Sequence, residues 1–234
     1  MSSLHSTLSE ALGTALLLAA VVGSGIMAER LAGGNVAIAL LANAIATGAA
    51  LYALIVTFSP HSGAEFNPVV TVALVFHGLA PRGRIVPHVL AQFGGAIAGV
   101  WLAHLMFDLP ILQTSLKVRS GVGQWTGEAV ATFGLVLVVL LGASRKSPSL
   151  PAVVACYITA AYWFTSSTSF ANPAVTIARM LSDTFAGIRP SSVPAFVAVQ
   201  IVAALSAVAL VKFLHPDVAA GDIVVPHERS RAAG

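Results

Sequence analysis

Phe66-Asn67-Pro68-Val69-Val70-Thr71, in the first half of the chain, has a counterpart in the second half, Ala171-Asn172-Pro173-Ala174-Val175-Thr176. Each copy opens an apolar stretch, Asn67–Gly78 or Asn172–Leu181, of about half the ~20 residues that a bilayer-spanning helix needs. Proline is favoured at the first position of a helix and asparagine is favoured as its cap, so each copy predicts a helix start. Paired, interrupted apolar segments in matching halves indicate a solute path at the membrane midplane.

The composition places the chain in the membrane class. Of its 234 residues, 57% are hydrophobic and 9% are charged, whereas soluble domains carry about 25% charged residues. A formal net charge of +3 does not indicate a nucleic-acid partner, because no basic run with interleaved aromatic residues accompanies it. The single cysteine, Cys156, excludes a disulfide within the chain, and we expect it to be a small buried hydrophobe.

Longer apolar segments surround the two short ones. Six are long enough to span a bilayer: Leu8–Arg30, Val36–Phe58, Val86–Phe107, Trp125–Ala143, Leu150–Ser167 and Val193–Leu214. We therefore predict an all-α membrane protein with six transmembrane helices and two re-entrant half-helices. Its channel domain covers residues 8–214, between an N-terminal tail at 1–7 and a flexible C-terminal tail at 215–234. No basic residue precedes the first span, so we expect a retained helix rather than a signal peptide.

The chain divides into two repeats, residues 8–110 and 124–214. Glu10-Ala-Leu-Gly-Thr opens the first and Glu128-Ala-Val-Ala-Thr opens the second. Three spans in each repeat is an odd number, so the repeats are expected to lie inverted in the membrane. The two half-helix N-termini, each worth about half a positive charge, then face the same point. Such a site repels cations and accepts neutral hydrogen-bonding solutes.

The segments that approach the two motifs are expected to line the solute path. Non-helical backbone at membrane depth is tolerated only inside protein or against water. We therefore expect carbonyl groups of Ser59–Phe66 and Thr165–Ala171 to face an aqueous path. The side-chain amides of Asn67 and Asn172 can donate hydrogen bonds to a solute there.

Basic residues modestly favour cytoplasmic termini in an inner or plasma membrane, because cytoplasmic loops carry an excess of lysine and arginine. With both termini inside, the inner side carries Arg82, Arg84, Arg145, Lys146, Lys212, Arg229 and Arg231. The outer side then carries Arg30, Lys117, Arg119, Arg179 and Arg189.

Over about Leu8 to Leu214, the chain resembles the aquaporin and aquaglyceroporin family, the major intrinsic proteins. The resemblance rests on Ser62–Thr71 (SGAEFNPVVT), on Ser169–Ala174 (SFANPA) and on the repeat starts at Glu10 and Glu128. It implies a channel of six helices and two half-helices, assembled as a homotetramer with one pore per subunit. It also implies passive diffusion of small neutral solutes. Glu10 and Glu128 would then hydrogen-bond the backbone of the re-entrant loops.

The resemblance implies a constriction of four side chains on the outer side of the two motifs. Counting along the matching segments puts them at Thr47, Ala160, Ser169 and Val175. The family almost always has arginine where this chain has Val175, so the constriction loses a fixed charge and up to five donors. Ala160 leaves space where water-selective members place a larger ring.

Two further departures lie in the first motif. It reads Asn67-Pro68-Val69 instead of Asn-Pro-Ala, and Glu65 stands where the family usually has histidine. Glu65 is a candidate for the inner vestibule, with bonding to local backbone donors as an equal alternative. Arg179, four residues after Val175, is a candidate for the outer vestibule, although an arginine that snorkels to the interface is the commoner outcome.

An arginine-free filter of small hydroxyl groups favours solutes larger than water. It resembles the aquaglyceroporins associated with bacterial arsenic resistance, so we expect a channel for metalloid acids such as arsenite, for glycerol, or for both. An ordinary water and glycerol channel is the alternative. An ion- or proton-coupled transporter that uses Glu10 and Glu128 is less favoured. No nucleophile–base pair, phosphate loop or metal cluster stands out, so we expect no catalytic residue, cofactor or metal.

Overall fold

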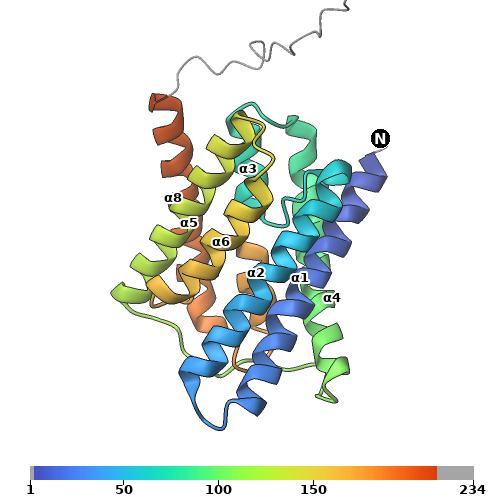
Figure 1. Cartoon of the computed structure of the whole chain (residues 1–234), viewed down its shortest axis with the longest axis vertical. Helices are drawn as coiled ribbons and strands as arrows, with labels where there is room; N and C mark the ends of the chain where they lie inside the picture. The colour runs from blue at the N-terminus through green and yellow to red at the C-terminus, as the bar shows by residue number, and fades with distance from the viewer. Residues whose placement is uncertain (1–2, 215–234) are drawn as a thin grey trace, which may run out of the picture.

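Helix-favouring apolar segments, divided by glycine and proline, produce the eight α-helices of the computed structural model, which describes residues 3–214 (Figure 1). They are α1 (Ser3–Leu31), α2 (Val36–Ser62), α3 (Pro68–Phe76), α4 (Ile85–Met106), α5 (Val122–Ser144), α6 (Leu150–Phe164), α7 (Pro173–Arg179) and α8 (Val193–Leu214). The short 3-10 helices η1 (Arg82–Arg84) and η2 (Pro190–Ser192) precede α4 and α8.

The sequence-based boundary differs from the structure at the N-terminal end of the channel domain. The tail predicted at residues 1–7 is wrong from Ser3 onward, because α1 already begins there. The tail predicted at 215–234 lies outside the described residues. At the other boundaries, the helices follow the predicted segments to within a few residues.

Within residues 3–214, five helices are long and apolar enough to cross a membrane: α1, α2, α4 with η1, α5 and α8 with η2. The predicted fifth span is shorter than expected, because α6 has 15 residues and ends at Phe164. Thr165 has an extended conformation, and from there the chain runs as a non-helical segment to the second Asn-Pro motif.

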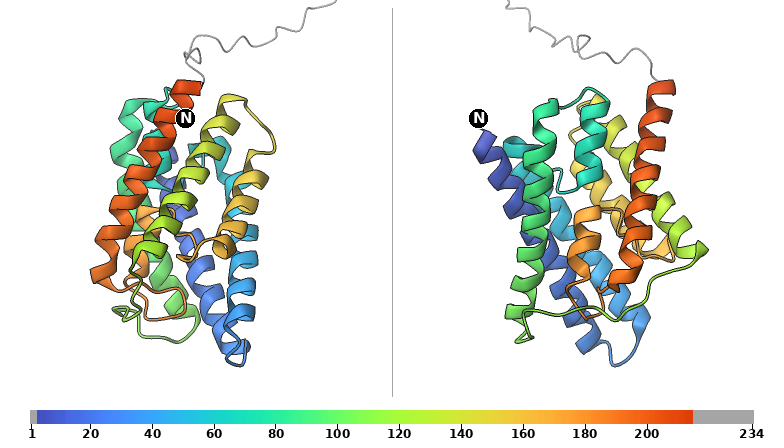
Figure 2. Two further views of the ribbon diagram at one scale, coloured as in Figure 1. Left: turned by 90° about the vertical axis from the view of Figure 1, so that its left-hand side faces the viewer. Right: turned by 180° about the vertical axis from the view of Figure 1, so that it is seen from behind.

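The half-helices α3 and α7 lie between the longer helices, α3 in one half of the bundle and α7 in the other (Figure 2). The start of α1 and the end of α8 lie at the same end of the molecule, the end at which α3 sits. The long connection between α4 and α5 lies at the opposite end, beside α7. This arrangement agrees with inverted repeats whose half-helices enter from opposite sides.

Small residues allow close contact between α1 and α4. A Cβ atom on Gly95 would lie 2.1 Å from the Ala11 carbonyl oxygen, and one on Gly99 would lie 2.1 Å from that of Ala15. Close backbone approach through such small-residue faces is a common packing mode for membrane helices.

The outer surface of the bundle is apolar, as contact with lipid requires. Its large exposed side chains include Leu12, Leu41, Leu90, Val130 and Leu205. Cys156, expected to be buried, is exposed on this surface instead. In a bilayer an apolar side chain gains as much from lipid as from a protein core, so hydrophobicity alone did not indicate which face of α6 Cys156 occupies.

Candidate functional site

The two Asn-Pro motifs begin the half-helices in the same way. Pro68 and Pro173 each occupy the first helical turn. The Oδ1 atom of Asn67 accepts a hydrogen bond from the Val69 amide at 3.1 Å, and Oδ1 of Asn172 accepts one from the Ala174 amide at 2.9 Å. These caps satisfy amide groups that have no partner within a helix, as the sequence predicts.

The same two asparagines tie the half-helices together. Asn67 Nδ2 donates to the carbonyl of Ala171 at 2.8 Å, and Asn172 Nδ2 donates to the carbonyl of Phe66 at 2.8 Å. Each side-chain amide therefore donates one N–H to the opposite loop. A second N–H remains on each, since a side-chain amide has two.

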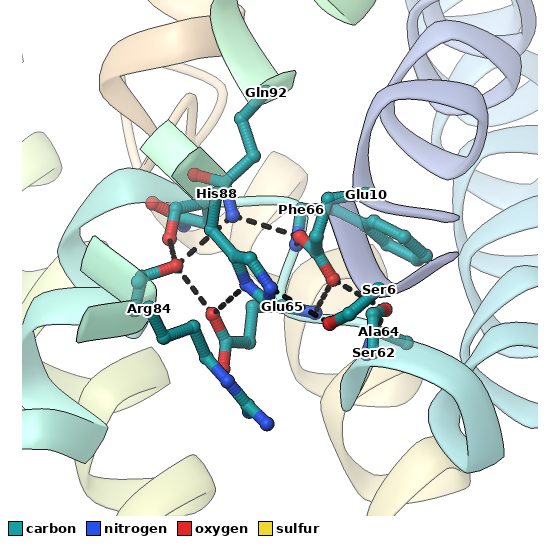
Figure 3. Close-up of polar contacts among 11 residues, drawn as sticks. Ser6, Glu10, Ser62, Ala64, Glu65, Phe66, Arg84, His88 and Gln92 are labelled. Atoms are coloured by element: carbon teal, nitrogen blue, oxygen red, sulfur yellow. Dashed lines mark hydrogen bonds and ion pairs between the residues drawn. The ribbon is translucent and has the colours of Figure 1, made fainter. Parts of the chain in front are cut away.

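Glu10 holds the loop that leads into α3. Its Oε1 accepts hydrogen bonds from the Ser62 hydroxyl at 2.6 Å and the Glu65 amide at 3.0 Å. Its Oε2 accepts from the Phe66 amide at 2.7 Å and from Gln92 Nε2 at 2.8 Å (Figure 3). The carboxylate is fully buried, so these donors replace the water that an ionised carboxylate would otherwise need.

Glu128 occupies the matching place in the second repeat. It accepts hydrogen bonds from the amides of Phe170 at 2.8 Å and Ala171 at 2.9 Å, and from Gln200 Nε2 at 2.7 Å. Sequence reasoning singled out both glutamates but missed the glutamines. The sequence did contain a signal for them, since Gln92 and Gln200 are each the one side-chain amide in the mostly apolar third span of its repeat.

The two loops share a pattern of backbone strain. Five non-glycine residues of these loops adopt left-handed conformations, with φ of 53° at Ala64, 48° at Phe66, 62° at Thr168, 51° at Ser169 and 47° at Ala171. Each costs about 1–3 kcal/mol and persists only where the surroundings over-determine it. The hydrogen bonds to Glu10 and Glu128 provide that constraint, and they hold loop backbone against the cavity wall.

A cavity runs past both motifs. Its volume is about 160 Å³, well above the roughly 10–15 Å³ that a single water molecule needs. Of the residues singled out from the sequence, the wall contains Thr47, Glu65, Asn67, Ser169, Asn172, Val175 and Arg179. The motif residues Pro68, Val69, Pro173 and Ala174 are buried but do not line this cavity.

The predicted place of Ala160 in the constriction is wrong. Ala160 is exposed on the outer surface of α6, and the residues of α6 that line the cavity are Leu150, Val154, Ile158 and Tyr162. These recur every four residues and so form one face of the helix, whereas Ala160 lies two residues from the nearest of them. The hydroxyl of Tyr162, which sequence reasoning missed, donates to Thr47 Oγ1 at 3.3 Å.

Two arginines lie close to one aromatic ring, that of Phe170, beside the half-helix α7. Cζ of Arg179 lies 3.5 Å from the centroid of Phe170, and Cζ of Arg119 lies 4.9 Å from it. Arg179 and Arg119 are 2% and 6% exposed, so Arg179 is buried in the cavity wall rather than snorkelling to an interface. Arg119, from the α4–α5 connection, was not identified from the sequence as a site residue.

Glu65 belongs to a second buried network, at the α3 end of the cavity (Figure 3). Its Oε1 pairs with Arg84 Nη1 at 3.0 Å, and its Oε2 lies 3.0 Å from His88 Nδ1 and 2.6 Å from the Thr71 hydroxyl. His88 Nε2 in turn lies 2.9 Å from the Ser6 hydroxyl. Glu65 therefore lines the cavity while side chains, not local backbone amides, hold its carboxylate.

Glu10, Glu65 and His88 are close enough to resemble a metal site, since one ligand atom of each lies within 4.8 Å of the others. Each of these atoms, however, already has a protein partner. A cation would have to displace several of these hydrogen bonds. The geometry therefore favours a structural network over a metal centre.

Comparison with known proteins agrees with this geometry. The sequence matches the family described as "Major intrinsic protein" over residues 1–164. It is 54% identical over 205 residues to aquaglyceroporin AqpS of Rhizobium meliloti, covering 88% of this chain and 88% of that protein. It is also 35% identical over 97 residues to aquaporin Z of Bradyrhizobium diazoefficiens, covering 42% of this chain and 40% of that protein.

The fold is similar to that of the aquaglyceroporin from Plasmodium falciparum, seen in an X-ray structure. The TM-score is 0.67, with 93% of this chain and 97% of that chain covered at 20% sequence identity. At that identity the similarity establishes the fold alone.

Proposed function

The chain belongs to the major intrinsic protein family, and on that premise we propose that its pore passively conducts neutral solutes larger than water, namely metalloid acids such as arsenite, glycerol, or both. Membership makes the chain a multi-pass membrane channel of the aquaglyceroporin kind for small solutes, and not an enzyme. The name of its 54% identical relative, an aquaglyceroporin, supports a solute larger than water.

Val175 is the observation that carries the proposal. It lines the cavity directly after the second motif, and Thr47 and Ser169 line the same cavity. At position 175, where an arginine would place a bulky charged fork, the wall has an apolar side chain, beside the small hydroxyl groups of Thr47 and Ser169. We propose Thr47, Ser169 and Val175 as filter residues, with Tyr162 in place of Ala160.

With Tyr162 instead of Ala160 as the fourth filter residue, fewer observations support a solute larger than water. The space expected at Ala160 no longer contributes, so the case for a large solute rests on Val175 and on the size of the cavity. Tyr162 also adds an aromatic ring and a hydroxyl to the wall. An ordinary water and glycerol channel therefore remains the alternative to be tested.

Light scattering by liposomes that contain the purified protein separates these functions. After an osmotic shock with glycerol or arsenous acid, we expect faster re-swelling than in protein-free liposomes. Acceleration of water flux alone would identify a water channel. If the protein accelerates the entry of neither glycerol nor arsenous acid, the proposal is wrong.

Val175→Arg tests the filter assignment. The longer side chain would project into the cavity and add a fixed charge, so we expect glycerol and arsenite fluxes to fall at least about tenfold while water flux persists. A tenfold change corresponds to about 1.4 kcal/mol in the barrier. Val175→Ala is the matched control and should retain the solute fluxes. Unchanged solute fluxes in Val175→Arg would remove Val175 from the filter.

We further propose a homotetramer in the cell membrane, with both termini cytoplasmic. The described ends of α1 and α8 lie on the same side of the bundle, as this topology requires. That side also holds η1, the end of α5 and the end of α8 (Figure 2). In or next to these segments lie Arg82, Arg84, Arg145, Lys146 and Lys212, which favours placement of this side in the cytoplasm. Native mass spectrometry measures the assembly, and protease access in oriented vesicles tests the topology.

A further inference from the structure

We propose that Arg179 is a specificity-determining residue whose terminal amino groups donate hydrogen bonds to solute oxygens at the outer end of the pore. This inference rests on the proposed function, because it names the donor by which that pore selects its solutes. Arg179 would thus supply the hydrogen-bond donors and the positive charge that the side chain of Val175 lacks.

Arg179 shares the cavity with the filter residues. It is the last residue of α7, one helical turn after Val175, and both line the cavity together with Thr47 and Ser169. A helical side chain leans toward the N-terminus of its helix, which carries the guanidinium back toward the position of Val175. At 2% exposure, the charge is held inside the protein.

The guanidinium is fixed on one edge and available on the other. Nε donates to the Ala186 carbonyl, and the group stacks on Phe170 with Cζ 3.5 Å from the ring centroid. Among the described residues, no hydrogen-bond partner is found for its two terminal amino groups. A planar guanidinium anchored in this way presents its remaining donors as a fixed fork, suited to a solute with two oxygen atoms.

Arg119 adds a second positive charge to the same place. Its Cζ lies 4.9 Å from the centroid of the same Phe170 ring, and its donors go to the carbonyls of Gly187 at 2.8 Å and Ser167 at 3.1 Å. Within the described residues, neither Arg119 nor Arg179 forms an ion pair. The nearby carboxylate of Glu128 is occupied by backbone amides and Gln200.

Ser169 supplies a complementary group. Ser169 lines the cavity, and its buried hydroxyl has no hydrogen-bond partner in the described part of the chain. A hydroxyl can rotate to donate or accept, so Ser169 can pair with an O–H group while Arg179 binds an oxygen. This combination fits polyols and undissociated oxyacids. The two arginines disfavour cations at the same point.

The experiment compares Arg179→Met and Arg179→Lys with wild type in liposomes, using glycerol and arsenous acid as solutes and sodium currents as the second measurement. Arg179→Met removes donors and charge, so we expect solute flux to fall about tenfold, as for the loss of one hydrogen bond to a charged group, and a sodium leak to appear. Arg179→Lys keeps the charge without the planar fork, so solute flux should fall while sodium stays excluded. Arg189→Met, at an exposed position of the same side of the protein, is the control and should match wild type.

A rescue variant separates a functional role from a structural one. Val175→Arg combined with Arg179→Met restores a charge one turn earlier and should abolish the sodium leak; a leak that persists would overturn the proposed role of the charge. If Arg179→Met does not fold, Arg179→Lys decides. Wild-type fluxes in both Arg179 variants would overturn this inference alone, whereas a wild-type protein that conducts neither solute would overturn the proposed function instead.

Discussion

Lys117 shows how the protein environment alters one charged residue at the α7 end of the bundle (Figure 2). It lies in the α4–α5 connection and donates from Nζ to the Phe185 carbonyl at 2.8 Å. Partial desolvation of the amine, together with repulsion from Arg119 and Arg179, lowers its pKa from 10.5 to about 8, while Glu29 opposes the shift. A lowered pKa favours the neutral amine, so this end of the protein loses positive charge as the pH rises through about 8.

Competitive acylation followed by mass spectrometry measures this pKa. We expect the reactivity of Lys117 to rise with a midpoint near pH 8, because only the neutral amine reacts. Glu29→Gln removes the attracting carboxylate and should move the midpoint lower. The unfolded chain, with the higher pKa, binds more protons between pH 8 and 10.5, so this residue makes folding more favourable as the pH rises through that window. A midpoint near 10.5 would contradict the assignment.

At the scale of single elements, the half-helices could be predicted from the sequence because their signals are local. An Asn-Pro cap acts on the next turn of the chain, and the apolar length that follows can be counted. The lining face of α6 was missed because the assignment of Ala160 counted back from Asn172 across residues 165–171. Thr168, Ser169 and Ala171 in that segment have φ of 62°, 51° and 47°. Because this backbone is irregular, the number of residues across it does not indicate which way a side chain of α6 points.

The fourfold spacing of Leu150, Val154, Ile158 and Tyr162 would have been a better guide, since it follows one face of a helix. Arg119 and His88 were missed for a different reason. Each lies far along the chain from the groups that it contacts, and single-sequence patterns carry no information on which distant side chains meet. The partners of Glu65 and Phe170 could therefore be identified only from the structure.

The α1–α4 contact gives the prediction that belongs to the element scale. Gly99→Ala would place a Cβ 2.1 Å from the Ala15 carbonyl oxygen, so the two helices must separate, at a cost of about 1–3 kcal/mol. Gly94, on the same helix, faces open space, because a Cβ at this position would have no neighbouring atom within 4 Å. Gly94→Ala is therefore the control and should gain up to about 1 kcal/mol from helix propensity.

Thermal unfolding of both variants in detergent measures the difference. We expect a lower midpoint for Gly99→Ala and an equal or higher midpoint for Gly94→Ala. Equal midpoints in the two variants would mean that the helices tolerate separation, and the close contact would then carry little of the stability.

At the scale of the whole molecule, the two repeats build the same hydrogen-bonded unit twice. Gln92 donates to Glu10 and to the Thr71 hydroxyl, and Gln200 donates to Glu128 and to the Thr176 hydroxyl. Each unit fixes one loop, and the crossed bonds of Asn67 and Asn172 join the two loops. The path between the repeats is thus held by groups that are bonded to one another, which favours a fixed channel over a moving carrier.

The same occupancy argues against proton coupling. A coupling carboxylate must release and rebind its proton as the solute moves, and every oxygen of Glu10 and Glu128 already accepts from a buried donor. A proton carried by either carboxylate would have to displace one of these donors. We therefore expect glycerol flux to depend only on the glycerol gradient.

Radiolabelled glycerol in liposomes should equilibrate without accumulating, and an imposed proton gradient or a protonophore should leave its initial rate of uptake unchanged. Accumulation above the external concentration would establish coupled transport, and Glu10→Gln and Glu128→Gln would then show which carboxylate carries the proton.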